Sequence, residues 1–464
     1  MSTTTSSKPV LTVGAYGGEL QAQRVHLVSL GCPKNRIDSE VMVGKLQAGA
    51  YELVPDPADA DVIVVNTCSF IQPATEESID TVIEMAKFKE LGTCKKLVVT
   101  GCMVQRYGRT LEGELPEVDY FLGTGEYHRI TDVLRARDGE APRSHVDVPM
   151  YIHDELAPRV NSWSRASAYL KISEGCNHTC TFCIIPTLRG KLRSRTIDSL
   201  VVEATRLAEQ GVVELNLVSQ DSTAYGRDLR DGTGLGDLLQ RLSDIEKIQW
   251  IRLHYAYPHG LPDGLLEQLA DNPKVCKYLD IPLQHASGSV LKAMKRGVTR
   301  AGQERILARV RERIPDIAVR TTFIVGFPGE TDADFAELCD FVRSQRFDHV
   351  GVFTFFQEDG VPASELPNQV PDEVKLSRQA ELMALQADLS RERLHSLVGE
   401  TRPVLIEGVA EESELLLKGR LEIQAPDVDG QVYITSAPED VQVGQIRQVL
   451  FSQIGDYDLV GEIV

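Results

Sequence analysis

Hydrophobic and polar positions alternate differently in successive parts of the chain. Between residues 24 and 135, short continuous apolar runs are separated by longer stretches in which apolar residues recur every three or four positions. Continuous runs are typical of strands buried on both faces of a parallel sheet, and the longer spacing is typical of helices. This pattern predicts a doubly wound α/β domain. We expect strands at 25–31, 61–66 and 96–101, and helices at 37–50 and 74–88.

The middle of the chain repeats the strand and helix alternation six times. We expect its strands at 168–173, 212–219, 250–257, 278–284, 318–327 and 349–356, and a long helix at 371–399. Six such units predict a full or partial (β/α) barrel like the TIM barrel, and periodicity alone does not choose between the two.

The end of the chain has short β-type runs separated by turn residues. The runs at 402–409, 413–423, 430–436 and 444–464 predict a small all-β barrel of five strands, similar in shape to the oligonucleotide-binding (OB) fold. The whole chain is therefore expected to comprise a disordered leader at 1–21, an N-terminal domain at 22–137, a linker at 138–161, a barrel core at 162–395 and the small barrel at 396–464.

Composition narrows the class of protein. The first residues lack the basic start and apolar core of a signal peptide, and no apolar run is long enough to cross a bilayer, so we expect a soluble, cytoplasmic protein without membrane contact. Nine cysteines, an odd number, favour metal binding or redox chemistry over a disulfide framework. The net charge of -19 disfavours nucleic acid over most of the surface and favours a basic protein partner.

Three cysteines lie close together after the first strand of the barrel core. Cys176, Cys180 and Cys183 can give one thiolate each to three irons of a [4Fe-4S] cluster, which leaves the fourth iron without a protein ligand. An open iron can chelate S-adenosylmethionine and pass one electron into its sulfonium group, while the protein supplies position and shelter. The alternatives are a zinc site with His178 as the fourth ligand, and unligated buried thiols.

With Phe182 directly before the last of these cysteines, the stretch EGCNHTCTFCIIP resembles the signature of radical S-adenosylmethionine enzymes. The stretch IVGFPGET, with Gly326 and Gly329, is similar to the glycine motif beside the adenine of that cofactor; the alternative is an ordinary turn. Ser194 and Arg195 are candidates for orienting the cofactor carboxylate, and a solvated basic turn is the alternative.

Polar residues follow three further strands of the expected barrel. Enzymes of this architecture bind ligands at the carboxyl ends of their strands, so these residues are candidates for lining the pocket, with Gln220 assigned to the cofactor. The alternative is that they only cap their strands. They are Gln220, Asp221, His254, Tyr257, Gln284 and His285.

A second set of three cysteines lies in the N-terminal domain. Cys32, Cys68 and Cys102 each come shortly after a predicted strand, at separations of 36 and 34 residues. Parallel strands end at one edge of a sheet, so the three thiols can converge and hold a second three-thiolate cluster. The alternative is three small buried hydrophobic residues. The remaining cysteines, Cys94, Cys276 and Cys339, are expected to be structural.

Domain order and both cysteine sets resemble the methylthiotransferase family over nearly the whole chain. The resemblance implies two [4Fe-4S] clusters, and S-adenosylmethionine as both radical source and methyl donor. It also implies that the terminal barrel, called a TRAM domain, presents the substrate. One branch of that family modifies an adenosine (N6-isopentenyladenosine) in transfer RNA, and the other modifies the β-carbon of an aspartate in small-subunit ribosomal protein twelve.

The stretches LVSLGCPKN and IRLHYAYP are more similar to those of the protein-modifying branch. The charge of the terminal barrel favours the same branch. Residues 396–464 hold 13 Asp and Glu but only 4 Lys and Arg, and this net charge of -9 suits a basic ribosomal protein better than RNA. The alternative is that this acidity serves only solubility.

We therefore expect a monomeric transferase that works with an electron-donor protein and contacts RNA only through the ribosome. The transfer-RNA enzyme is the first alternative to this hypothesis. A non-catalytic iron-sulfur or zinc sensor is the second.

Overall fold

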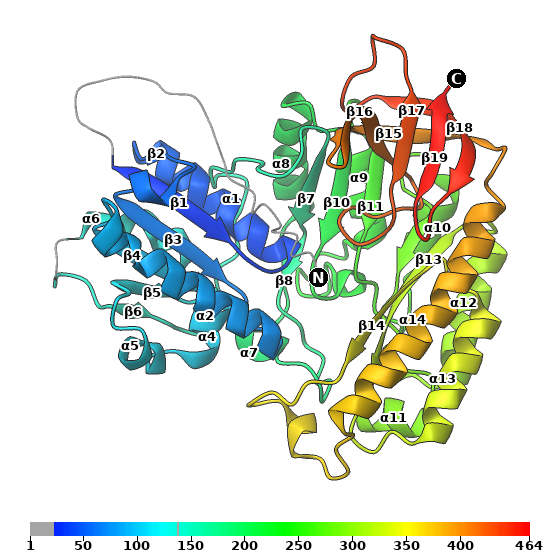
Figure 1. Ribbon diagram of the computed structural model, residues 1–464, viewed down its shortest axis with the longest axis horizontal. Helices are drawn as coiled ribbons and strands as arrows, with labels where there is room; N and C mark the ends of the chain where they lie inside the picture. Colours follow the sequence, from blue (N-terminus) through cyan, green and yellow to red (C-terminus); the bar gives the residue numbers. More distant parts are fainter. Residues whose placement is uncertain (1–22, 137–138) are drawn as a thin grey trace. The chain divides into compact units, whose positions relative to one another are not determined.

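The computed structural model describes residues 23–136 and 139–464 (Figure 1), so the expected leader at 1–21 lies outside the described residues. The chain forms two compact units. The first holds the described residues up to Trp163 together with Glu174–Asn177 and Ile184–Arg195, and the second holds Ser164–Ser173, His178–Cys183 and Thr196–Val464. Within the described ranges, none of the helices combines the length and apolar character that crossing a bilayer requires.

The first unit contains a six-stranded sheet in which every pairing is parallel, in the order β2-β1-β3-β4-β5-β6. The strands are β1 (Arg24–Ser29), β2 (Glu52–Leu53), β3 (Val62–Thr67), β4 (Lys96–Gly101), β5 (Tyr120–Leu122) and β6 (Ser144–His145). The predicted strands β1, β3 and β4 are confirmed. The other three have only two or three residues each, which is too short to establish a periodicity.

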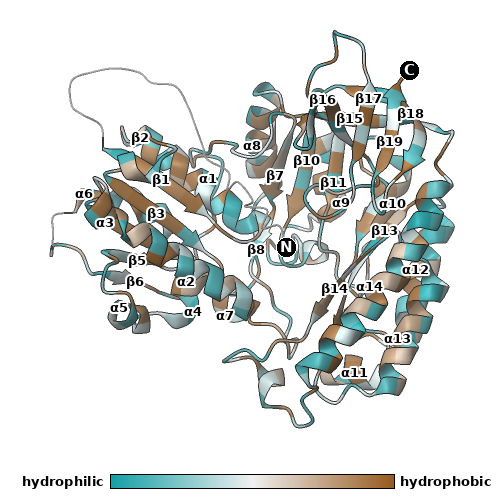
Figure 2. Ribbon diagram, viewed as in Figure 1, coloured by the Kyte–Doolittle hydropathy of each residue, from teal (hydrophilic) through white to brown (hydrophobic). Residues whose placement is uncertain are grey.

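Helices cover both faces of this sheet. α1 (Pro33–Ala48) and α6 (Ile130–Arg135) pack against Val62 and Val64 of β3 on one face, and α2 (Gln72–Ala86) packs against Ile63 and Val65 on the other. Neighbouring residues of one strand are therefore both buried, and Figure 2 shows β3 as mostly hydrophobic. The shorter elements are η1 (Pro57–Asp59), α3 (Phe88–Leu91), α4 (Cys102–Tyr107), α5 (Thr110–Glu114), η2 (Tyr127–Arg129), α7 (Ile185–Arg189) and β9 (Arg193–Ser194).

The second unit contains the predicted partial barrel. Its strands pair in parallel as β7-β10-β11 and β12-β13-β14, and a bridge between Ile251 and Val275 joins the two halves. These strands are β7 (Ser167–Lys171), β10 (Glu214–Val218), β11 (Trp250–Leu253), β12 (Tyr278–Asp280), β13 (Ala318–Val325) and β14 (His349–Thr354). All six were predicted from the sequence. The short strand β8 (Ser173–Glu174) follows β7.

Helices follow these strands and share one apolar core with them, to which β10 contributes Leu215 and Leu217. The longest helix, α14, corresponds to the one predicted at 371–399. The elements are α8 (Ile197–Glu209), η3 (Ser222–Ala224), α9 (Leu235–Ser243), α10 (Asp263–Asp271), α11 (Gly288–Ala293), α12 (Arg300–Arg313), α13 (Asp332–Gln345), η4 (Pro362–Glu365) and α14 (Asp372–His395).

The end of the chain forms a closed five-stranded barrel, as predicted, in the order β15-β16-β17-β19-β18. Its strands are β15 (Thr401–Ala410), β16 (Ser413–Leu421), β17 (Val432–Ser436), β18 (Ile446–Ile454) and β19 (Leu459–Ile463). Its apolar interior includes Val404, Val449 and Phe451, and it packs against Trp250 and Ala318, at the first residues of β11 and β13.

Buried charged groups hold the small barrel to the strands of the partial barrel. Arg420 of β16 pairs with Glu214, the first residue of β10, and Glu214 also pairs with Arg252 Nη2 at 3.1 Å. Asp429 accepts a hydrogen bond from the Tyr278 hydroxyl at 2.7 Å. The small barrel therefore docks where the strands begin, whereas the cysteine loop follows the end of β7.

These pairs affect the ionisation of the buried carboxyl group. Burial by itself would raise the pKa of Glu214, but the guanidinium groups of Arg420 and Arg252 outweigh burial and hold the pKa well below its usual value. Glu214 therefore stays charged inside the protein, and the stability of the second unit depends on both arginines.

We predict that Arg420→Ala lowers the free energy of unfolding of the second unit by about 3–5 kcal/mol, because it leaves a buried carboxylate without a partner. Unfolding by urea can be followed through the fluorescence of Trp250 in a Trp163→Phe background. Arg447→Ala is the control, since Arg447 pairs with the exposed Asp440 and should contribute at most about 1 kcal/mol. Equal losses in the two variants would contradict the buried network.

Candidate active site

The three N-terminal cysteines lie at adjacent strand ends. Cys32 precedes α1, Cys68 follows β3 and Cys102 begins α4 directly after β4. Since β1, β3 and β4 are neighbours and parallel, their carboxyl ends share one edge, and the order β2-β1-β3 places a topological switch point between β1 and β3. Ligands of open α/β sheets bind at such points.

The close approach of these strand ends requires a glycine. Gly31 has φ +84°, and a Cβ atom there would lie 2.7 Å from the Cβ of Cys68. Any other residue at position 31 would therefore collide with the side chain of Cys68.

Two of these cysteines have perturbed ionisation. Burial first, and then the charges of Cys102 and Cys32, raise the pKa of Cys68 to about 12. Burial likewise raises the pKa of Cys102, against the lowering effect of Arg189. Iron must therefore displace the protons of these thiols in order to bind.

A polar hub, which we define as Asn35, Asn66 and Arg189, supports this edge of the sheet. The Asn35 amide donates to the carbonyl oxygens of Leu30 at 2.9 Å and Thr67 at 2.8 Å, which precede Cys32 and Cys68. Its Oδ1 accepts from Arg189 at 2.6 Å, and Asn66 donates to the Asn35 carbonyl at 2.9 Å. The sequence analysis missed these three residues, although Asn35 lies in the stretch LVSLGCPKN.

The loop of the central cysteines is shared between the two units, with Cys176 in the first and Cys180 and Cys183 in the second. The Cys176 N–H donates to the Gly190 carbonyl at 3.0 Å, and the Cys183 N–H donates to the Cys180 carbonyl at 3.2 Å. Cys180 is buried, whereas Phe182 and Cys183 are half-buried.

A buried arginine contacts one of these cysteines. Arg296 Nη1 lies 3.7 Å from Cys180 Sγ, and its guanidinium lies over the ring of Tyr257 at 4.2 Å. His178 stacks on the ring of Tyr257, with ring centroids 3.7 Å apart, and its Nε2 is 2.7 Å from Asp221. Arg296 was not singled out in the sequence.

A zinc site requires three or more ligand side chains that converge on one metal ion. In the described part of the chain, no three His, Cys, Asp or Glu side chains are spaced so as to hold a single metal ion. Thiols at the corners of a cubic cluster bind separate irons, so they stand further apart than thiols that share one zinc ion.

The glycine motif is held by a carboxylate. Gly326 has φ +71°, and the Glu330 side chain accepts hydrogen bonds from the N–H groups of Gly326 at 2.7 Å and Phe327 at 3.2 Å. Glu330 in turn accepts from Arg378 of α14 at 2.9 Å and lies 3.5 Å from His285 Nε2. The loop is therefore preorganised by Glu330, which the sequence analysis missed.

The other predicted strand-end residues have different surroundings. Gln220 is half-buried directly after β10. Gln284 adopts a left-handed backbone, with φ +75°, after β12. Such conformations in residues other than glycine cluster at functional sites. His254 is buried among the strands, with Nε2 3.2 Å from Asn216 Oδ1.

Ser194 and Arg195 belong to the first unit, where Arg195 Nη1 lies 3.2 Å from His153 Nε2. Their assignment to the cofactor carboxylate stays a prediction, and so do the cofactor contacts of Phe182, Gln220 and the two glycines.

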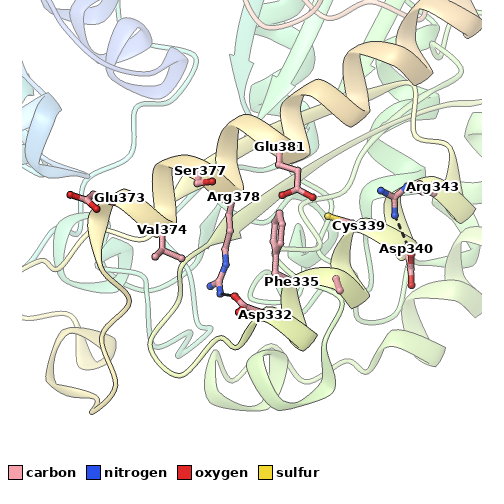
Figure 3. A pocket seen from close by; sticks show the side chains of 11 residues that line it. Asp332, Phe335, Cys339, Asp340, Arg343, Glu373, Val374, Ser377, Arg378 and Glu381 are labelled. Atoms are coloured by element: carbon pink, nitrogen blue, oxygen red, sulfur yellow. Dashed lines mark hydrogen bonds and ion pairs between the residues drawn. The ribbon is translucent and has the colours of Figure 1, made fainter.

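A groove of about 540 Å³ lies between α13 and α14 (Figure 3), away from the predicted site residues. Within it Arg378 pairs with Asp332, and Arg343 pairs with Asp340. It is lined by Asp332, Phe335, Ala336, Cys339, Asp340, Arg343, Glu373, Val374, Ser377, Arg378 and Glu381. Arg378, which lines this groove, also donates a hydrogen bond to Glu330 of the glycine loop.

Comparison with known proteins agrees with this arrangement. The family model described as "Uncharacterized protein family UPF0004" matches residues 24–123, the radical SAM superfamily model matches residues 170–342 and the TRAM domain model matches residues 398–464. The structure of the radical S-adenosylmethionine methyltransferase TsrM from Kitasatospora setae, solved with cobalamin and a [4Fe-4S] cluster, has a TM-score of 0.54 at 15% identity. It covers 74% of this chain and 77% of TsrM, and shows the shared fold.

Two curated relatives are similar over almost their whole length. The ribosomal protein uS12 methylthiotransferase RimO of Anaeromyxobacter sp. is 53% identical, over 95% of this chain and 93% of the relative. The RimO protein of Pelobacter propionicus is 51% identical, over 96% and 98%.

The fold and the matching family models together define a radical S-adenosylmethionine enzyme with a terminal TRAM domain. Its cofactors are S-adenosylmethionine and [4Fe-4S] clusters. More specifically, the chain belongs to the family of ribosomal protein uS12 methylthiotransferases named RimO.

We predict that Glu330→Gln weakens the binding of S-adenosylmethionine about tenfold or more, because a neutral amide holds the two backbone N–H groups of the glycine loop less strongly than a carboxylate. Equilibrium binding to the iron-loaded protein measures the effect. Glu381→Gln, at an exposed position of the α13–α14 groove, is the matched control. Unchanged affinity in Glu330→Gln, or an equal loss in Glu381→Gln, would contradict this assignment.

Proposed function

We propose that this protein replaces a hydrogen on the β-carbon of one aspartate of ribosomal protein uS12 with a methylthio group, using two [4Fe-4S] clusters and S-adenosylmethionine. The observation that carries the proposal is the second set of thiols, Cys32, Cys68 and Cys102, gathered at the edge of the N-terminal sheet. A radical S-adenosylmethionine enzyme needs only one set of three cysteines for its radical, so a second set indicates sulfur insertion.

In this proposal Cys176, Cys180 and Cys183 hold the radical-generating cluster, and Cys32, Cys68 and Cys102 hold the cluster that handles sulfur. When bound, the radical-generating cluster would pass one electron from the donor protein to S-adenosylmethionine, which would supply the carbon radical and the methyl group, and the second cluster site would hold or supply the sulfur.

The chain's own residues position and shelter these groups. Arg296 offers a cation to Cys180. Glu330 fixes the glycine loop at the strand ends that bind ligands in this architecture. Gly326 and Gly329, with Phe182, Gln220, Ser194 and Arg195, are proposed to contact the cofactor.

The TRAM domain supports a basic protein as the partner. Each of its four basic residues is already engaged with a carboxylate: Arg402 with Glu400, Lys418 with Glu411, Arg420 with Glu214 and Glu407, and Arg447 with Asp440. The net charge of -9 for residues 396–464 is therefore not accompanied by a cationic patch that RNA phosphates require. Complementary charge speeds the encounter with a basic ribosomal protein.

Because the TRAM domain docks where the barrel strands begin, we propose that it holds the ribosomal partner at a distance from the reacting aspartate. We further propose that the enzyme is a cytoplasmic monomer that receives electrons from a donor protein and meets RNA only through the ribosome.

Of the alternatives, a transfer-RNA substrate and a non-catalytic metal sensor are both less consistent with the relatives, which are named as uS12 methylthiotransferases.

We predict that replacing Cys176, Cys180 or Cys183 by Ala abolishes the formation of 5′-deoxyadenosine from S-adenosylmethionine, because the radical-generating cluster loses a ligand. Chromatography of the reaction products measures it. Cys94→Ala, at a buried cysteine of the N-terminal core, is the control and should leave product formation unchanged. A cluster variant that still forms 5′-deoxyadenosine would refute the ligand assignment.

We predict that the iron-loaded enzyme adds a methylthio group to ribosomal protein uS12 and leaves transfer RNA unmodified. The two substrates are incubated separately with enzyme, reductant and S-adenosylmethionine, and then weighed by mass spectrometry. A mass increase on transfer RNA with none on the protein would favour the alternative branch of the family.

A further inference from the structure

Arg189 reaches the strand-end cysteine site from a distant part of the sequence. It is the last residue of α7, which follows the central cysteine loop, yet α7 belongs to the first unit. Its side chain is 3% exposed, and its Nη2 lies 3.5 Å from Cys102 Sγ. The segment that continues the radical-generating loop thus contributes a buried cation to the other cysteine site.

The guanidinium is held by acceptors from separate segments. Nη1 donates to Asp38 at 2.6 Å and to Glu174 at 3.3 Å, while Nη2 donates to Asn35 at 2.6 Å. Asn35 and Asp38 lie on α1 beyond Cys32, whereas Glu174 precedes Cys176 by two positions in the sequence. Arg189 therefore ties the helix that follows Cys32 to the start of α4, where Cys102 lies.

The charge of this group bears on an iron-sulfur cluster directly. A [4Fe-4S] core held by three thiolates is anionic, and reduction adds a further negative charge, so a buried cation beside one thiolate favours the reduced state. Without Arg189, the buried carboxylates of Asp38 and Glu174 would face that anionic cluster unopposed by this guanidinium. Arginine stays protonated at all accessible pH values, so its charge is constant.

We propose that Arg189 is a positioning residue of the sulfur-handling site: it fixes Cys102 relative to α1 and sets the reduction potential of the cluster held there. This inference rests on the proposed function, in which Cys32, Cys68 and Cys102 bind that cluster.

The test uses the full chain with Cys176, Cys180 and Cys183 replaced by Ala, so that only the strand-end cluster contributes. An electron paramagnetic resonance titration gives its midpoint potential. In Arg189→Gln the reduced-to-oxidised ratio at a fixed potential should fall at least tenfold, which is about 59 mV for one electron. Arg109→Gln, at an exposed arginine of the same unit, is the control and should leave the potential unchanged.

Arg189→Lys separates charge from geometry and also serves if the glutamine variant does not fold. Lysine keeps the positive charge, so the reduction potential should stay near that of the parent. Its ammonium group cannot donate to the same acceptors in the planar geometry of a guanidinium, so a chelator should remove iron faster than from the parent. Unchanged potential in a folded Arg189→Gln variant, or parental chelation kinetics in Arg189→Lys, would overturn the proposal. If the parent with Arg189 intact binds no iron at all, the ligand assignment itself fails instead.

Discussion

Parallel strands end at one edge of their sheet, and both cysteine sites of this enzyme depend on that constraint. In the N-terminal domain, β1, β3 and β4 lie side by side, so three cysteines that are far apart in sequence reach one place. In the partial barrel the same rule places the cysteine loop after β7 and the glycine loop after β13 at the carboxyl ends of their strands. The fold thus gathers each set of cysteines at strand ends.

Buried polar side chains then fix the positions of the residues at these strand ends. Asn35 donates hydrogen bonds to the backbone next to Cys32 and Cys68, and the Arg189 guanidinium contacts Cys102. The Glu330 carboxylate holds the glycine loop. Each is buried and hydrogen-bonded, which makes its removal costly but its geometry well defined. A comparable network of Glu214, Arg252 and Arg420 attaches the TRAM domain to the strand starts and leaves the carboxyl ends free of it.

Sequence reasoning recovered the parts that depend on local pattern. The three longest strands of the first unit, the six barrel strands and the closing small barrel follow from apolar periodicity, and both sets of cysteines follow from their spacing relative to strands. The hub and the docking network could not be predicted, because their partners are distant: Asn35 and Arg189 are 154 residues apart, and Glu214 and Arg420 are 206 apart. Nothing in a local pattern identifies which buried arginine meets which acceptor.

The central claim is that the strand-end thiols form a second cluster site. The most direct measurement is the iron content and ⁵⁷Fe Mössbauer spectrum of the anaerobically loaded wild-type chain. Our account predicts about eight irons per chain, all in [4Fe-4S] clusters. About four irons per chain, or zinc in place of iron, would contradict it.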